Sequence, residues 1–251
     1  MKKVTLIISL IFICNITISQ NLAFYGLLPA INQTGRINKK INYNLFISTT
    51  IDAFNEKVNG VEYPATDLQF YLQPSIIYVH SSNLNFAGSY TYQRNNPINP
   101  NFVNENRVWQ QVIFSFPISS GRLTNRFRFE ERFIENKATG NYPFSTRARY
   151  QVGFNMPFQG RTLDIHEFYF NTYNEFYFSL TGAKNATYSE NWTYSGCGYD
   201  LGKMGRLELG YLFQFAVRNK AQDLRFLNLA QIMWITNFNF LKKKKDGPQT
   251  K

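Results

Sequence analysis

Cysteine is almost absent from this chain of 251 residues. Of its two cysteines, Cys14 lies in an N-terminal apolar stretch that we expect to be removed, which leaves Cys197 alone. A single cysteine excludes both an intramolecular disulfide and a thiolate metal site. The fold must therefore be stabilised by hydrogen bonds and packing.

Long apolar runs and helical periodicity are also missing after the N-terminal segment. A membrane helix needs about 20 consecutive apolar residues, and the one apolar stretch, residues 4–14, is shorter. It follows Lys2 and Lys3 and leads into small polar residues. This pattern predicts a secretory signal peptide over residues 1–19. The alternatives are a transmembrane helix and a lipoprotein lipidated at Cys14.

Acidic residues are few. There are 16 acidic and 27 basic residues, a formal net charge of +11, and residues 242–251 form a lysine-rich tail. A basic balance can indicate nucleic-acid binding. Here, however, the basic residues alternate along strands, so we expect no nucleic-acid partner. Aromatic residues make up 17% of the chain, which is typical of a protein whose surface faces lipid.

Period-two alternation recurs along the chain and predicts strands. Most of these segments reach the roughly 9–11 residues that cross a bilayer with tilt. Because single-chain bacterial barrels have even strand numbers, we expect ten or twelve strands, with the first segment only partial or one long segment divided. The eleven segments are 22–31, 41–54, 68–80, 85–94, 107–118, 123–135, 145–156, 165–180, 192–200, 206–217 and 226–240.

The connectors between these segments alternate in length. Short turns on one side and long polar loops on the other are typical of an outer-membrane barrel. We therefore expect the long loops outside the cell and the tail at 242–251 in the periplasm. The short connectors are 81–84, 119–122, 158–164 and 201–205, and the long ones are 55–67, 95–106, 136–144, 181–191 and 218–224.

The stretch TNRFRFEERF, residues 124–133, places charges and aromatics on opposite faces of one strand. A soluble β-sandwich explains such a pattern locally, with the apolar face as its core. The uniformity of the pattern over most strands, with no helix to cover them, favours lipid outside and water inside. Backbone groups in lipid must all be paired, so the sheet must close. We predict an all-β fold, a closed antiparallel transmembrane β-barrel of 10–12 strands over residues 20–241.

The same alternation predicts which side chains line the lumen. Adjacent strands lie close enough for side chains to pair across them, and a confined arginine is costly unless it is paired. Arg–Glu ladders are thus the structural expectation, and a binding patch for a small anionic solute is the alternative. The long side chains should leave a closed or narrow passage that favours anions. The predicted lumen-lining residues are Arg126, Arg128, Glu130, Arg132, Arg147, Arg149, Glu167, Asn171, Glu175, Glu208 and Gln214.

Catalytic motifs are missing. There is no Gly-x-Ser-x-Gly sequence, and the only histidines, His80 and His166, fall at predicted strand ends beside short turns. Glu130 and Glu131 are neighbours on a strand and point to opposite faces, so they cannot act as an acid–base pair. No carboxylate cluster resembles a calcium or magnesium loop. We expect no catalytic residue, no metal and no cofactor; the alternative is an outer-membrane enzyme that acts on lipid.

Four motifs in a fixed order carry a family resemblance: RFRFEERF (126–133), RARYQ (147–151), NEFYFSL (174–180) and LELGYLFQ (207–214). Together they resemble the DUF2490 family of Gram-negative outer-membrane proteins. The resemblance implies a β-barrel of uncharacterised function and supplies no catalytic residues. Outer-membrane lipid and the barrel-assembly machinery are the expected partners, because the last segment ends on aromatic residues. The abundance of Asn, Lys and Ile suggests a Bacteroidetes-type source.

Overall fold

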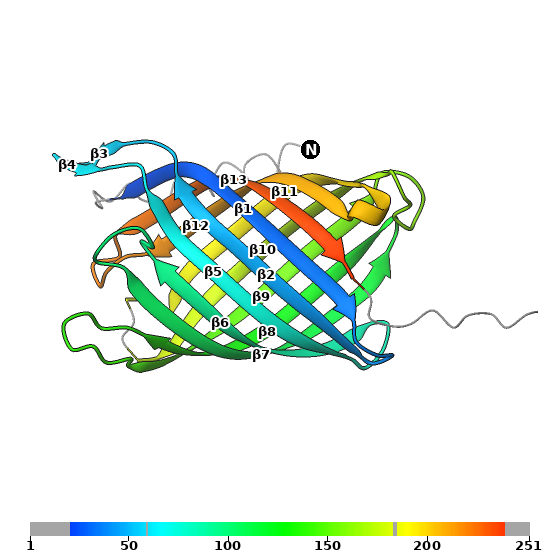
Figure 1. Cartoon of the computed structure of the whole chain (residues 1–251), viewed down its shortest axis with the longest axis horizontal. Helices are drawn as coiled ribbons and strands as arrows, with labels where there is room; N and C mark the ends of the chain where they lie inside the picture. Colours follow the sequence, from blue (N-terminus) through cyan, green and yellow to red (C-terminus); the bar gives the residue numbers. More distant parts are fainter. Residues whose placement is uncertain (1–20, 59, 183–184, 239–251) are drawn as a thin grey trace, which may run out of the picture.

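Strands make up most of the described chain in the computed structural model (Figure 1), which describes residues 21–58, 60–182 and 185–238. The predicted signal peptide, 1–19, and the basic tail, 242–251, lie outside the described residues. A short hairpin, β3 (Glu56–Val58) and β4 (Val61–Tyr63), extends from the loop after β2. The barrel strands are β1 (Leu22–Arg36), β2 (Ile41–Asp52), β5 (Asp67–Val79), β6 (Leu84–Asn95), β7 (Val103–Ile118), β8 (Gly121–Ile134), β9 (Phe144–Pro157), β10 (Phe168–Thr181), β11 (Tyr188–Asp200), β12 (Arg206–Val217) and β13 (Leu224–Asn237).

The sheet closes on itself as an eleven-stranded barrel. Each barrel strand is antiparallel to the next one along the chain, but β1 and β13 pair in parallel, from Leu22 opposite Arg225 to Thr34 opposite Asn237. An odd number of alternating strands can only close through one parallel pair. The expected even number was therefore wrong. The first segment is not a partial strand, since β1 has 15 residues and pairs on both sides.

Several strand boundaries differ from those predicted; β1, for example, continues to Arg36, and β11 begins at Tyr188. β7 begins at Val103 rather than at residue 107, because hydrogen bonds from Asn99 N to Asn96 O and from Phe102 N to Asn99 O tighten the preceding loop. β10 begins at Phe168 rather than at residue 165, because His166 has a positive φ of 65° that belongs to a turn. The difference at β7 adds inward-facing residues to the barrel wall, and the difference at β10 removes Glu167 from it.

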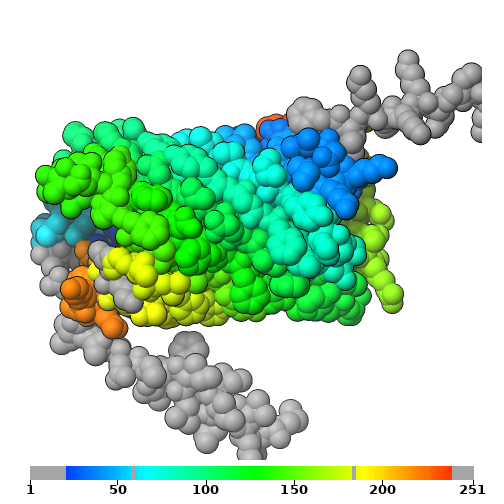
Figure 2. All heavy atoms as spheres, turned by 90° about the horizontal axis from the view of Figure 1, so that it is seen from below, coloured from blue at the N-terminus to red at the C-terminus, as the bar shows by residue number. Residues whose placement is uncertain are grey.

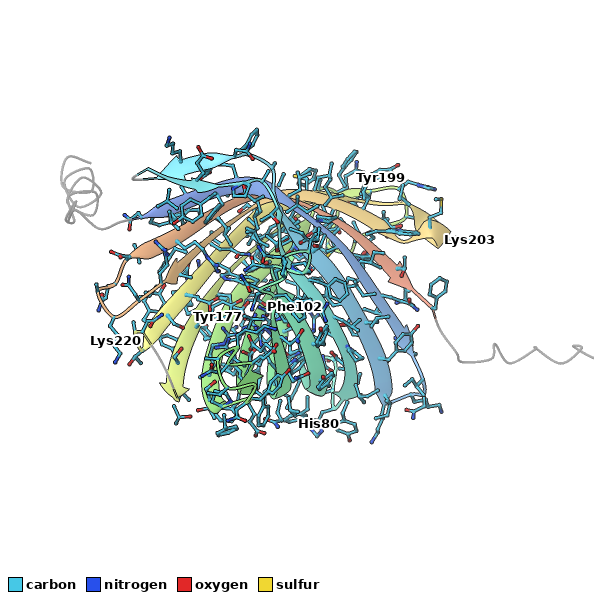
Figure 3. The ribbon with its side chains drawn as sticks, turned by 60° about the vertical axis from the view of Figure 1, so that its left-hand side comes forward. His80, Phe102, Tyr177, Tyr199, Lys203 and Lys220 are labelled. Atoms are coloured by element: carbon cyan, nitrogen blue, oxygen red, sulfur yellow. The ribbon has the colours of Figure 1, made fainter. Side chains whose placement is uncertain are left out.

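The connectors gather at two ends of the barrel. The β2–β5, β6–β7, β8–β9, β10–β11 and β12–β13 connectors meet at one end, which we call the long-loop end. The β1–β2, β5–β6, β7–β8, β9–β10 and β11–β12 connectors meet at the other, which we call the short-turn end. Lys220 and Lys203 mark these two ends in Figure 3. β1 starts at the long-loop end and β13 finishes at the short-turn end.

The two faces of the wall have opposite character. Large apolar side chains stand exposed on the outside, as Phe127, Phe129 and Tyr211 do at 53%, 40% and 51% exposure. Most fully buried charged groups, such as Glu130 and Glu175, point inward. The outer side chains over β5 to β10 form a continuous surface (Figure 2). Within the described residues, no helix has the length and apolar character needed to cross a membrane.

Candidate functional site

The lumen contains a cavity of about 540 Å³. Its lining includes Asn95, Glu105, Ile134 and Arg147, which lie near the strand ends that meet at the long-loop end. On β6 to β12 the cavity occupies the long-loop half of the barrel, and along β2 and β5 it reaches Asn44 and Ile77 near the short-turn end. Its size falls within the roughly 300–1,000 Å³ typical of small-molecule sites.

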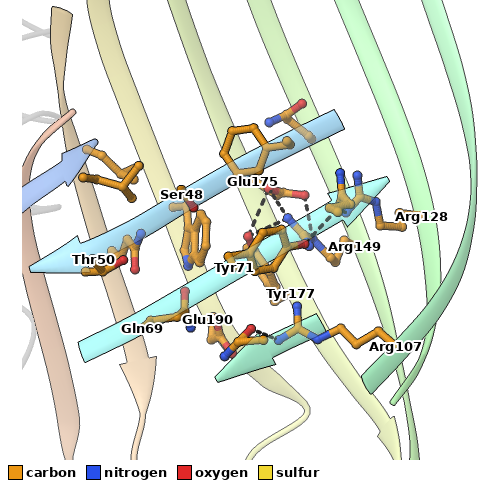
Figure 4. A pocket seen from close by; sticks show the side chains of 18 of the residues that line it. Ser48, Thr50, Gln69, Tyr71, Arg107, Arg128, Arg149, Glu175, Tyr177 and Glu190 are labelled. Atoms are coloured by element: carbon orange, nitrogen blue, oxygen red, sulfur yellow. Dashed lines mark hydrogen bonds and ion pairs between the residues drawn. The ribbon is translucent and has the colours of Figure 1, made fainter. Parts of the chain in front are cut away.

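One wall of the cavity is a network of arginines and glutamates on β8, β9 and β10. Arg149 is at its centre, with Nη2 2.7 Å from Glu175 Oε2 and Nη1 2.7 Å from Glu130 Oε1. Arg147 lies 2.6 Å from Glu130, and Arg126 lies 2.5 Å from Glu175. Figure 4 shows Arg149 and Glu175 facing each other across neighbouring strands. The strand register explains this arrangement. Arg147 lies directly opposite Glu130. Gln151 lies directly opposite Glu175, so Arg149, two residues before Gln151 on the same face of β9, reaches Glu175 diagonally.

A second group extends the network on β7. Glu105, 1% exposed, accepts hydrogen bonds from Arg132 at 2.6 and 3.0 Å and from Arg107. Arg107 also donates to Gln93 on β6. Of this group we predicted only Arg132 to line the lumen, because Glu105 was assigned to the loop before β7. The two-residue spacing of Glu105, Arg107, Trp109 and Gln111 is the sequence signal that could have identified it.

Positive charge exceeds negative charge in this network. Arg128 is stacked on Trp109, with its guanidinium carbon 3.8 Å from the ring centroid, and donates to Gln111 at 2.9 Å. Its nearest carboxylate is Glu130, at 3.7 Å. The network joins six arginines, Arg107, Arg126, Arg128, Arg132, Arg147 and Arg149, to four glutamates, Glu105, Glu130, Glu175 and Glu190.

The opposite wall carries an apolar patch among polar side chains, because Asn32, Asn44, Gln214, Arg225 and Gln231 also line the cavity there. Leu28, Leu212 and Leu227 are at most 6% exposed, pack in one cluster and also line the cavity, next to Phe46 and Met233. In the barrel order, β8 is five strands from β1 in one direction and five strands from β13 in the other. The arginines of β8 therefore lie across the bore from the leucines around the β1–β13 seam.

Two tyrosines occupy the short-turn half of the lumen. Tyr194 lies against Gly210, where an added Cβ would come within 2.6 Å of the Tyr194 Cζ atom, and Tyr169 lies against Gly198. Glycine here lets each ring lie flat on the inner wall. The Tyr194 hydroxyl donates to Glu208 at 2.8 Å. These rings are 0% and 2% exposed, so they fill space beyond the cavity.

The predicted lumen residues fall into four groups. Glu130 is enclosed behind the arginines that it pairs with, at 0% exposure. Asn171 donates to Glu208 at 3.1 Å, away from the arginine network. Glu167 precedes β10 and accepts the backbone N–H groups of Gln159 and Asp164, so its assignment to an arginine ladder was wrong. The predicted residues that line the cavity are Arg126, Arg128, Arg132, Arg147, Arg149, Glu175 and Gln214.

The described part of the chain contains no group of three or more His, Cys, Asp or Glu side chains that could hold a metal ion. His80 and His166 both lie in connectors at the short-turn end, and Figure 3 labels His80 there. The His166 ring faces Tyr199, at 6.2 Å between centroids. Neither histidine lines the cavity.

A family model described as a protein of unknown function (DUF2490) matches residues 29–225. No curated protein and no solved structure matches the chain.

Proposed function

Since the chain belongs to the DUF2490 family, whose function is unknown, we propose that it is an outer-membrane β-barrel with a narrow, anion-selecting lumen. The observation that carries this proposal is the inverted distribution of side chains. Apolar residues are exposed on the outside, while an arginine-rich network is buried inside. Water-soluble monomers rarely expose large contiguous apolar surfaces.

Polar groups on the outer face support the membrane location. In lipid, a hydroxyl or amide needs a protein partner, because no water is present to hydrogen-bond with it. Each of three outward-facing tyrosines donates a hydrogen bond to an asparagine on the neighbouring strand. In each pair the asparagine is two positions away from the residue that lies directly opposite the tyrosine in the strand register. These pairs are Tyr90–Asn106, Tyr150–Asn125 and Tyr211–Asn228. Outer-membrane lipid is then the partner of this face, and the barrel-assembly machinery is the proposed route of insertion.

The charge balance of the lumen supports selection of anions. An excess of two arginines over glutamates in the network leaves a positive potential in a confined, low-dielectric bore, which favours anions over cations. The passage is narrow because Tyr169 and Tyr194 fill part of the short-turn half. No catalytic role is part of this proposal.

Fractionation and single-channel recording test the proposal together. We expect the protein in the outer-membrane fraction, and in a planar bilayer we expect small conductance steps with anions more permeant than cations. The double variant R126Q/R128Q should lower the anion-to-cation permeability ratio. R206Q is the matched control, because Arg206 is exposed and pairs with Asp200 at the short-turn end. Recovery from the soluble periplasm, or a large unselective channel, would contradict the proposal.

A further inference from the structure

The apolar patch on the wall opposite the arginine network is unexpected for the lumen of a transmembrane barrel. Inward-facing side chains of a transmembrane barrel are expected to be polar, yet β1, β12 and β13 turn leucines inward. Some of this surface is buried within the cluster itself, as Leu229 is at 0% exposure. Leu28, Leu212 and Leu227 border the cavity, and Phe46 and Met233, which are only partly buried, pack against them and line it as well. Wetting apolar surface is unfavourable in proportion to its area, so this wall favours an apolar occupant.

The arginine wall, in the same cavity, favours an anionic occupant. Arg126 makes one ion pair, through Nη2 to Glu175, and its side chain keeps 19% exposure, the largest among the six arginines of the network. Arg128 has no carboxylate closer than 3.7 Å among the described residues. Confined positive charge is stabilised by an opposite charge close by, and a planar guanidinium matches a carboxylate or phosphate well.

Neither kind of simple ligand satisfies both walls. A small hydrophilic anion would leave the partly buried Phe46 and Met233 of the apolar patch facing water, and a neutral apolar molecule would leave the excess arginine charge uncompensated. We propose that the cavity binds an amphiphilic anion, an acidic head group on an unbranched apolar tail, with the head at Arg126 and Arg128 and the tail along the patch of Leu28, Phe46, Leu227 and Met233. This inference rests on the proposed anion-selecting lumen and names its ligand class.

The cavity volume sets the expected dependence on tail length. At about 540 Å³, it can hold a medium-chain tail, and each methylene placed on the apolar wall should tighten binding roughly fourfold. Affinity should therefore rise from hexanoate to octanoate to decanoate. The increase should stop once the tail fills the cavity.

The binding experiment uses the full protein in nanodiscs of zwitterionic phosphatidylcholine, with empty nanodiscs as the blank for partition into lipid. The probes are hexanoate, octanoate, decanoate, the uncharged decanol, and inorganic phosphate. Calorimetry gives the dissociation constants. Quenching by decanoate brominated at its terminal carbon reports whether the tail enters the cavity, because Trp109 and Trp192 line it.

The expected result is that decanoate binds at least tenfold more tightly than decanol or hexanoate. R126Q should weaken decanoate binding about tenfold without a comparable effect on decanol, and L28N should remove the dependence on tail length. R206Q should bind decanoate like the wild type. Because L28N leaves the arginine network intact and R126Q leaves the apolar wall intact, either variant alone keeps the inference testable if the other does not fold.

Other results would overturn the inference in distinguishable ways. Phosphate binding as tight as decanoate would mean a simple anion site; the ligand class would be wrong and the proposed function would stand. Equal affinity for decanol and decanoate would mean that the arginines do not recognise the head group. If no anion binds and none permeates in the bilayer recording, the proposed function fails as well.

Discussion

Replacing Glu175 with glutamine tests whether the arginine network stabilises the barrel. Glu175 is 2% exposed and accepts hydrogen bonds from Arg126 at 2.5 Å, from Arg149 at 2.7 and 2.8 Å, and from Tyr177 at 3.0 Å. Glutamine keeps the volume, so no cavity forms, but it leaves two arginines without their shared carboxylate. Removing one partner from a buried ion pair costs about 3–5 kcal/mol, and we expect E175Q to lose stability in this range. E175R, which adds a like charge, should lose more.

The assay is reversible unfolding by urea in lipid vesicles, followed by the loss of heat-modifiable mobility on gels. The double variant R126Q/E175Q should recover part of the loss, because it also removes one uncompensated charge, and the coupling energy should be about 1–3 kcal/mol. E62Q is the control: Glu62 is exposed on the β3–β4 hairpin, 3.9 Å from Lys57, and should leave stability unchanged. A loss below about 1 kcal/mol in E175Q would refute the argument, since it would mean that lumen water screens the pair.

Three further predictions address packing, orientation and catalysis. G210V should destabilise the barrel by about 1–3 kcal/mol through overpacking, measured by the same urea assay, and replacing Tyr194 with leucine in that variant should restore part of the loss. A cysteine at Asn99, exposed at the long-loop end, should react with an impermeant maleimide in whole cells, whereas one at Ser82 should react only after lysis; the reverse labelling would refute the orientation. Purified protein incubated with lipopolysaccharide or phospholipid should give no product by mass spectrometry, and a product that disappears in H166A would show that the protein is an enzyme.

The faces of the wall could be predicted from the sequence because a strand has a strict two-residue period. The alternation of Arg126, Arg128 and Glu130 with phenylalanines placed the charges on the inner face before their partners were known. Partners on adjacent strands depend on register, which alternation alone does not fix. The pairing of Arg147 with Glu130 therefore needed the structure.

Three features of the site could not be predicted from the sequence, because they depend on local turns or on the order of the strands in the closed barrel. Glu105 could not be separated from its Asn-rich loop by composition, and Glu167 could not be separated from β10 because the turn at His166 has no strong signal in the sequence. The apolar wall was missed for a different reason. The inward face of β1 is as apolar as its outward face, so alternation cannot tell the two apart there. Only the barrel order places its leucines across from the arginines of β8.

The parallel β1–β13 seam has a consequence for how the barrel forms. Its paired residues, such as Leu22 and Arg225, are about 200 positions apart in the sequence, whereas most other ladders join strands that follow one another. Loop-closure entropy disfavours distant contacts, and their formation is slow. We therefore expect the antiparallel hairpins to form first and the seam to close last. Until it closes, β1 and β13 are free edges with unpaired backbone groups, which are the places where a second chain could pair and misassemble.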